Sequence, residues 1–284
     1  MTTKKSIISL ANNGGIALYC LLVVFPMLAA FVYAFLYSFG VVGVFSEGVT
    51  VRHWAALFSS SELARSIGLS IVLAFFTTLL SVFIGLLTGL ALHEHLRKGV
   101  FSTIAHIPLA IPPVVAAFAI IQLCSGSGFA ARLLLACGVI GSLAEFPSLV
   151  HDTLGIGIVC AFTLTAAPFF ALLFAALYES ENVRHLEELA ATLGASRLQR
   201  RWRVSIPLLV RRAGANITLL FVAVLGGYEI PLLLGLQSPQ MLSVLAHRKY
   251  AMFDLAEKPQ AFVLAVVYTA LVMVLLVFFM KKKR

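Results

Sequence analysis

Six long apolar runs constrain this chain more than any other feature of its sequence. They cover roughly residues 16–39, 66–92, 101–123, 153–178, 213–236 and 260–280. Each is long enough to cross a bilayer as a helix, because about 20 apolar residues span about 30 Å of hydrocarbon. The runs are continuously apolar rather than alternating, which disfavours a transmembrane β-barrel. We therefore predict an all-α polytopic membrane protein with six transmembrane helices, forming a single domain over residues 1–284.

Prolines interrupt two of these runs. Pro108, Pro112 and Pro113 fall in the third run, and Pro168 falls in the fourth. A proline frees a backbone carbonyl that neighbouring groups must satisfy in a membrane, so we expect kinks at these positions.

Basic residues are distributed unevenly over the connections between the runs. If the N-terminus is placed inside, fifteen of the 21 Lys and Arg residues lie on that side and six on the other. By the positive-inside rule, both termini and the connection between the fourth and fifth runs are predicted to be cytoplasmic. Most of the Lys and Arg residues behind the net charge of +9 lie on one side of the membrane, so we do not take this charge as a sign of a nucleic-acid partner.

The connection at about residues 179–212 is the longest polar stretch of the chain. Residues from Glu188 to Leu193 favour a helix, and Gly194 then permits a sharp change of direction. A second helical segment leads to Pro207, beyond which a helix cannot continue unchanged. We predict a short helix, a turn and a second helix outside the lipid, suited to pressing into a groove of another protein.

This stretch resembles the EAA loop of the ABC-importer permease family. An acidic residue, small residues, a Leu-Gly-Ala-Ser sequence and a proline eleven residues after the serine recur in the order of the family motif. Leu189 stands where the family usually has alanine. The resemblance implies the type I importer permease fold and an ATPase-coupling role for Glu188, Ala190, Ala191, Leu193, Gly194, Ala195, Ser196 and Pro207.

The resemblance also implies a multi-subunit machine in a bacterial inner membrane. The chain has no G-x-x-x-x-G-K-[ST] sequence and no catalytic set of side chains, so we predict that it is not an enzyme. ATP and Mg would be bound by two copies of a partner ATPase subunit, with no cofactor in this chain. A second permease subunit, either a copy or a homologous chain, and an extracytoplasmic solute-binding protein would complete the assembly.

Two groups of polar residues inside or beside the runs are candidates for metal binding or solute contact. His93 and His95 are two residues apart and should point to different faces of a helix, so we predict no metal site. Glu229 lies in an apolar run behind Tyr228, where a carboxylate usually faces a cavity or a partner. We predict that Glu229 and Tyr228 border the path of the solute. The alternatives are that Glu229 pairs with a neighbouring helix or that its side chain extends to the outer membrane interface.

The solute is predicted only as small and hydrophilic. The chain looks nearest to permeases for polyamines, ferric iron, thiamine and phosphonates. Two other functions stay open at this point. An ion-coupled secondary transporter would need intramembrane coupling groups or a repeated half, and a membrane scaffold would recruit a cytoplasmic partner through the arginine-rich loop.

Overall fold

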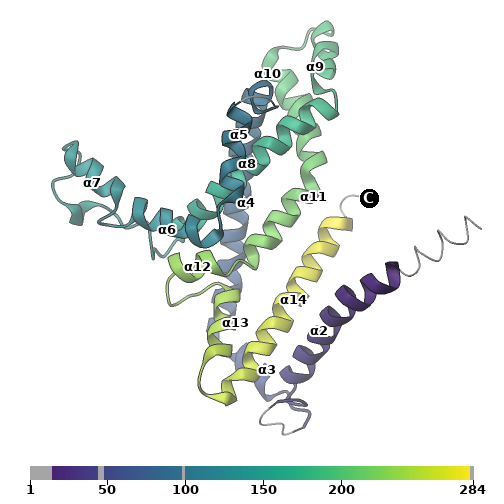
Figure 1. Ribbon diagram of the computed structural model, residues 1–284, viewed down its shortest axis with the longest axis vertical. Coiled ribbons are helices and arrows are strands. Elements are labelled where there is room, and N and C mark those ends of the chain that lie inside the picture. Colours follow the sequence, from purple (N-terminus) through teal and green to yellow (C-terminus); the bar gives the residue numbers. More distant parts are fainter. Residues whose placement is uncertain (1–14, 44–47, 98–99, 282–284) are drawn as a thin grey trace, which may run out of the picture. The chain divides into compact units, whose positions relative to one another are not determined.

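The computed structural model describes residues 15–43, 48–97 and 100–281, which form helices joined by turns and loops, without a strand (Figure 1). The chain divides into two compact units. The first comprises residues 1–63 and 245–274, and the second comprises residues 64–244 and 275–284. The expectation of a single domain over the whole chain stays a prediction.

Six segments are long and apolar enough to cross a membrane by length and composition. They are Gly15–Ser38, Ser61–Leu96, Pro113–Ala136, Ile156–Ser180, Arg197–Leu225 and Lys258–Phe278. The predicted number of spans is therefore confirmed for the described part of the chain. The basic residues at positions 4, 5, 98 and 282–284, which contributed to the predicted orientation, lie outside the described residues.

The second unit contains most of the long helices. Its elements are most of α4 (Ser61–Arg97), with α5 (Val100–His106), η2 (Ile107–Ala110), α6 (Pro113–Cys124), α7 (Phe129–Ala136), η3 (Leu143–Glu145), α8 (Ile156–Ser180), α9 (Val183–Thr192), α10 (Arg197–Arg200), η4 (Arg201–Ser205), α11 (Ile206–Leu225) and α12 (Glu229–Leu234). Helix α13 (Leu242–Ala251) begins in this unit, and its residues 245–251 belong to the first. Figure 1 shows α9 and α10 at one end of this unit, beyond the ends of α8 and α11.

The first unit is built around the aromatic ring of Phe262. It contains η1 (Cys20–Val24), α2 (Phe25–Ser38), α3 (Arg52–Ser59), η5 (Leu255–Glu257) and most of α14 (Lys258–Lys281). The ring of Tyr37 stacks on Phe262 with centroids 4.2 Å apart, and Tyr33 and Tyr250 meet its edge at 6.0 Å. Arg248 forms an ion pair with Glu62 in the same unit.

The helices α4 and α8 are held together by a pair of glycines one helical turn apart. A Cβ atom on Gly85 would lie 2.4 Å from Cβ of Phe170, and one on Gly89 would lie 2.9 Å from Cβ of Phe174. Both phenylalanines are fully buried in one core cluster of this unit. Small residues spaced in this way let membrane helices approach closely, and large side chains fill the remaining space.

The third and fifth predicted spans differ from the structure. The prolines break the third run completely, because Ile111 and Pro112 are extended and separate η2 from α6. Pro168, by contrast, lies inside the continuous helix α8. The fifth span begins earlier than predicted, at Arg197, and its helix ends at Leu225, so residues 226–236 are not part of it.

Candidate functional site

The predicted helix–turn–helix in residues 179–212 is confirmed. Helix α9 ends at a turn in which Gly194 has a φ of +83°, a conformation that favours glycine. The N–H of Gly194 donates to the carbonyl of Ala191, and the N–H of Ala195 donates to the carbonyl of Ala190. Ser196 then caps α10: its hydroxyl accepts from the N–H of Gln199 at 3.3 Å, and its own N–H donates to the Gln199 side chain at 2.9 Å.

A wide helical turn connects this motif to α11. Residues 201–205 form a π-helical turn, in which the N–H of Ile206 donates to the carbonyl of Arg201, five residues earlier. Pro207 follows in the first turn of α11. A proline cannot donate to the residue four positions before it and clashes with that carbonyl in a regular helix. The sequence analysis expected the helix to change beyond this proline, whereas the π turn precedes it and α11 continues through it.

Glu187 joins the loop to the spans on either side, and the sequence analysis missed it. Its carboxylate accepts a hydrogen bond from the Tyr178 hydroxyl of α8 at 3.2 Å and another from the buried hydroxyl of Ser205 in the π turn. The guanidinium of Arg200 donates to the backbone carbonyl of Glu187 at 3.5 Å. Glu187 lies four residues after the fully buried Val183, on the same face of α9. That spacing was the signal in the sequence that Glu187 faces the spans.

Glu188 and its neighbours face away from this anchoring side. Glu188 pairs with Arg184 at 3.2 Å, and both side chains are well exposed. Leu189, Leu193 and Leu198 present an apolar surface at the tip, and Leu193 is 88% exposed. Ala191, Gly194 and Ser196 are exposed at the same tip. The residues predicted for coupling thus lie in α9 and in the turn that leads to α10, apart from Pro207, which lies at the start of α11; their coupling role stays a prediction.

Comparisons with known proteins agree with this architecture. The family model of binding-protein-dependent transport system inner membrane components matches residues 81–282. The chain belongs to this family. It is similar to a probable molybdenum ABC transporter permease protein from Haloferax volcanii, with 28% identity over 168 residues. That match covers 58% of this chain and 57% of the relative, so it spans a little over half of the curated protein.

Two solved structures resemble the chain over nearly its whole length. One is a bacterial ABC transporter involved in the import of the acidic polysaccharide alginate, with a TM-score of 0.73 and 19% identity, covering 99% of this chain and 96% of that one. The other is a bacterial alginate ABC transporter in complex with an alginate pentasaccharide-bound periplasmic protein, with a TM-score of 0.73, 20% identity and coverages of 97% and 93%. Together with the family, they confirm the predicted multi-pass importer permease fold.

A polar recess adjoins the loop of this family member. It has a volume of about 570 Å³ and is lined by Glu94, Glu179, Glu188, Arg184 and His185, among others. His93 stacks on Tyr178 with ring centroids 4.3 Å apart, whereas His95 packs against Phe101 at 5.9 Å. The two histidines therefore have different partners, as their spacing predicted. The described residues contain no group of three side chains suited to hold a metal ion.

The surroundings of Glu229 and Tyr228 differ from what the sequence suggested. Glu229 does not lie inside a transmembrane helix, because α11 has already ended and Glu229 begins the short helix α12. Its side chain is exposed and has no hydrogen bond or ion pair with a described residue. Tyr228 packs against the core cluster that contains Ile230 and Leu234. A pathway role for either residue stays a prediction.

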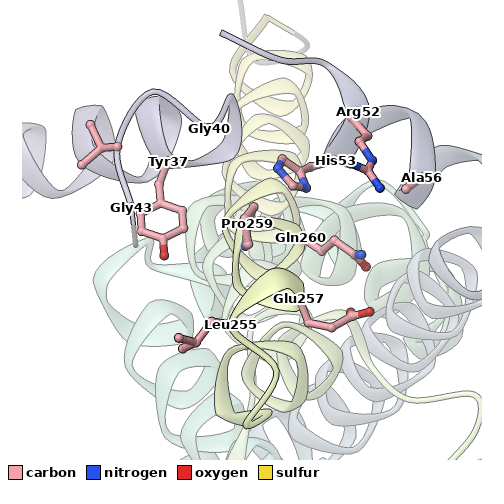
Figure 2. A pocket seen from close by; sticks show the side chains of 11 residues that line it. Tyr37, Gly40, Gly43, Arg52, His53, Ala56, Leu255, Glu257, Pro259 and Gln260 are labelled. Carbon is pink, nitrogen blue, oxygen red and sulfur yellow. The ribbon is translucent and has the colours of Figure 1, made fainter. Parts of the chain in front are cut away.

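The first unit contains a separate polar cavity of about 330 Å³. Figure 2 shows Arg52 and His53 of α3 together with Glu257 and Gln260, which lie in η5 and at the start of α14. The Glu257 carboxylate is already engaged by Lys249, with Nζ and Oε2 2.5 Å apart. Arg52 makes no ion pair with a described residue and so is the cationic group that this cavity offers.

Proposed function

We propose that this chain is the permease subunit of an ATP-binding-cassette importer and that it binds its ATPase through α9, the following turn and α10. The observation that carries the proposal is the apolar tip formed by Leu189, Leu193 and Leu198 in an otherwise polar loop. Large apolar side chains exposed together outside a membrane usually mark a surface that another protein covers. The position of this tip in a member of the importer family makes an ATPase the partner.

The proposed orientation places both termini and this loop in the cytoplasm of a bacterium, with the chain in the inner membrane. It rests on the positive-inside count and on arginines that surround the loop. Arg197, Arg201, Arg203 and Arg211 form no ion pair with described residues, which leaves them available to lipid phosphates or to the ATPase. With six spans, the connections that contain Arg52 and Glu257 then lie on the opposite side.

The proposed partners follow from the same assignment. Two ATPase subunits would bind and hydrolyse ATP with Mg, and this chain would have no enzymatic activity of its own. A second permease, identical or homologous, would complete the membrane part. A solute-binding protein would deliver the solute on the outer side, a partner class supported by the periplasmic protein in one of the similar structures.

We propose a polar, water-soluble solute and no narrower class from these comparisons. The relatives are named for molybdenum and for alginate, which differ greatly in size and chemistry. Polyamines, phosphonates, iron and thiamine, suggested by the sequence, remain hypotheses. A secondary transporter or a scaffold is the rival function, and either would be active without an ATPase.

Purification of the tagged chain from its native membrane tests the proposal. The wild-type chain should retain a P-loop ATPase in a mild detergent, and Leu193→Ala should lose most of it because the most exposed leucine of the tip is removed. Phe253→Ala is the matched control: Phe253 is also fully exposed, but it lies in the connection between the fifth and sixth spans. A wild-type chain that purifies without an ATPase, or a Leu193→Ala variant that retains it fully, would contradict the proposal.

A further inference from the structure

Asn216 is an amide near the middle of α11, one helical turn after Arg212. It lies about 15 Å from either end of α11 at about 1.5 Å per residue. Its side chain is partly exposed and forms no hydrogen bond with a described residue. By comparison, Thr218 on the same helix donates to the carbonyl of Gly214 at 2.9 Å, as hydroxyls in membrane helices commonly do. Asn216 therefore has no polar partner among the described residues.

A backbone carbonyl without a donor belongs to Leu109, another residue of the same region. The residues three and four positions after Leu109 are Pro112 and Pro113, and neither has an N–H to donate. The carbonyl of Leu109 therefore has no local helical donor, and no other described residue donates to it. It lies at the break between η2 and α6, where Ile111 and Pro112 are extended. Such irregular backbone occurs within a bilayer only where protein buries it or where it lines a water-filled cavity.

Leu109 and Asn216 both line one open groove of the second unit. The groove has a volume of about 490 Å³ and lies where η2, α6, α8 and α11 meet. Thr165 of α8 adds a hydroxyl, which donates to the carbonyl of Phe162 and keeps its oxygen available as an acceptor. The remaining wall is apolar and includes Phe169 and Leu219, and none of the residues that line the groove is charged.

We propose that this groove is a wall of the solute path and that Asn216 is its principal solute-contacting residue. This inference rests on the proposed importer function. A lipid tail could not satisfy the amide or the carbonyl, and unpaired polar groups are costly in hydrocarbon, so water and solute are the occupants that suit both. This wall offers hydrogen-bond donors and acceptors but no charged side chain. The path therefore recognises a solute that has both donors and acceptors, and the solute needs no ion pair with this wall.

This assignment moves the solute contact away from Glu229. A carboxylate in the path would favour cations, whereas the amide of Asn216 is neutral and can both donate and accept. The helix break and the unpaired amide come from separate segments of the chain, so they support the same groove independently. Discontinuous helices near the middle of the membrane border the binding site in several other transporters.

Thiol accessibility in the assembled transporter tests this inference. The variants Asn216→Cys and Ala215→Cys would be treated in native membrane vesicles with a membrane-impermeant thiol reagent, and modification of each position would be measured by peptide mass spectrometry. Ala215 is the matched control because it is exposed on the same helix but does not line the groove. A thiol in hydrocarbon stays protonated and unreactive, so we expect Asn216→Cys to react at least about tenfold faster.

The charge of the reagent tests the uncharged recognition. Cationic and anionic thiosulfonates of similar size should modify Asn216→Cys at rates whose ratio is within about threefold of that for a free thiol, because no charged residue lines the groove. A preference of more than about tenfold for one sign would overturn this part of the proposal. Equal, slow modification of Asn216→Cys and Ala215→Cys would overturn the whole proposal.

The effect of nucleotide separates this proposal from the proposed function. In an ATP-driven importer, ATP with vanadate should change the rate for Asn216→Cys, because the path then opens to the other side. Fast modification that does not respond to ATP and vanadate would support a water-filled groove and contradict the ATP-coupled function. Slow modification in a complex that still contains its ATPase would contradict the groove alone.

Discussion

Removal of the Glu187 carboxylate should loosen the coupling loop, whereas removal of the neighbouring Glu188 carboxylate should not. Glu187 accepts hydrogen bonds from Tyr178 and from the fully buried Ser205, so it joins α8, α9 and the π turn. Among the described residues, the Glu188 carboxylate forms an ion pair with Arg184 alone, and both side chains are well exposed. The two residues are adjacent and identical in type, so each serves as the control for the other.

The structure sets the size of the expected difference. A hydrogen bond to a charged group contributes about 1.5–3 kcal/mol, and a buried hydroxyl left without its partner costs about 1–3 kcal/mol. For Glu187→Ala we therefore expect a loss of about 2–4 kcal/mol in the local stability of the loop, reduced from the full sum because Glu187 is only partly buried. An exposed ion pair spaced by four residues on a helix contributes about 0.3–0.5 kcal/mol, which is the loss expected for Glu188→Ala.

Hydrogen exchange of the backbone amides in α9 and residues 201–206 measures this local stability in the purified complex. Since about 1.4 kcal/mol corresponds to a factor of ten, exchange in Glu187→Ala should be faster by more than about tenfold, and in Glu188→Ala by less than about threefold. Glu187→Gln retains one acceptor for Ser205 and should lie between them. Equal acceleration in Glu187→Ala and Glu188→Ala, or greater acceleration in the latter, would refute the anchoring role of Glu187.

Two further predictions concern glycines. Gly85→Ala should reduce the stability of the protein in detergent by about 1–3 kcal/mol because the new Cβ overlaps Phe170. Gly68→Ala is the control, because nothing lies within 4 Å of a Cβ at that position. Thermal unfolding of both variants measures the difference, and equal transition temperatures would contradict the prediction. Gly194→Val should strain the turn by about 1–3 kcal/mol, because residue 194 has a positive φ. Gly194→Asn should cost less, because asparagine tolerates positive φ. Proteolysis at the turn should therefore be faster in the valine variant than in the asparagine variant, and the opposite order would contradict the prediction.

The number of spans and the coupling motif could be predicted from the sequence because each depends on local properties. A continuous apolar run can satisfy its backbone in a membrane only as a helix, so the six runs correctly predicted six candidate spans, although prolines break the third run and the fifth run continues past the end of α11. The turn at Gly194 follows from a glycine between two helix-forming segments, and the cap at Ser196 follows from Gln199 three residues later. These features need no knowledge of what packs against them.

The features that the sequence did not reveal depend on contacts between distant segments. Glu187 and Glu188 look equivalent in the sequence, and only the positions of Tyr178 and Ser205 distinguish them. The end of α11 at Leu225 was hidden because the apolar residues continue into α12, so hydropathy alone extended the span to residue 236. Asn216 lay inside a predicted span, but its importance depends on the groove formed by η2, α6, α8 and α11.

The contacts at the base of the loop have a mechanical consequence for the proposed importer. Glu187 ties the loop to Tyr178 near the end of α8 and to Ser205 just before α11, and Arg212 of α11 pairs with Glu181 at 2.9 Å. The Tyr178 contact joins the fourth span to the loop, the Ser205 contact joins the loop to the fifth span, and the Arg212 contact joins the fifth span to the end of α8. A displacement of the tip by an ATPase would therefore move the ends of both helices together rather than bend a loose connection. The groove at Asn216 lies between the same two helices, so that motion would reach the proposed solute path directly.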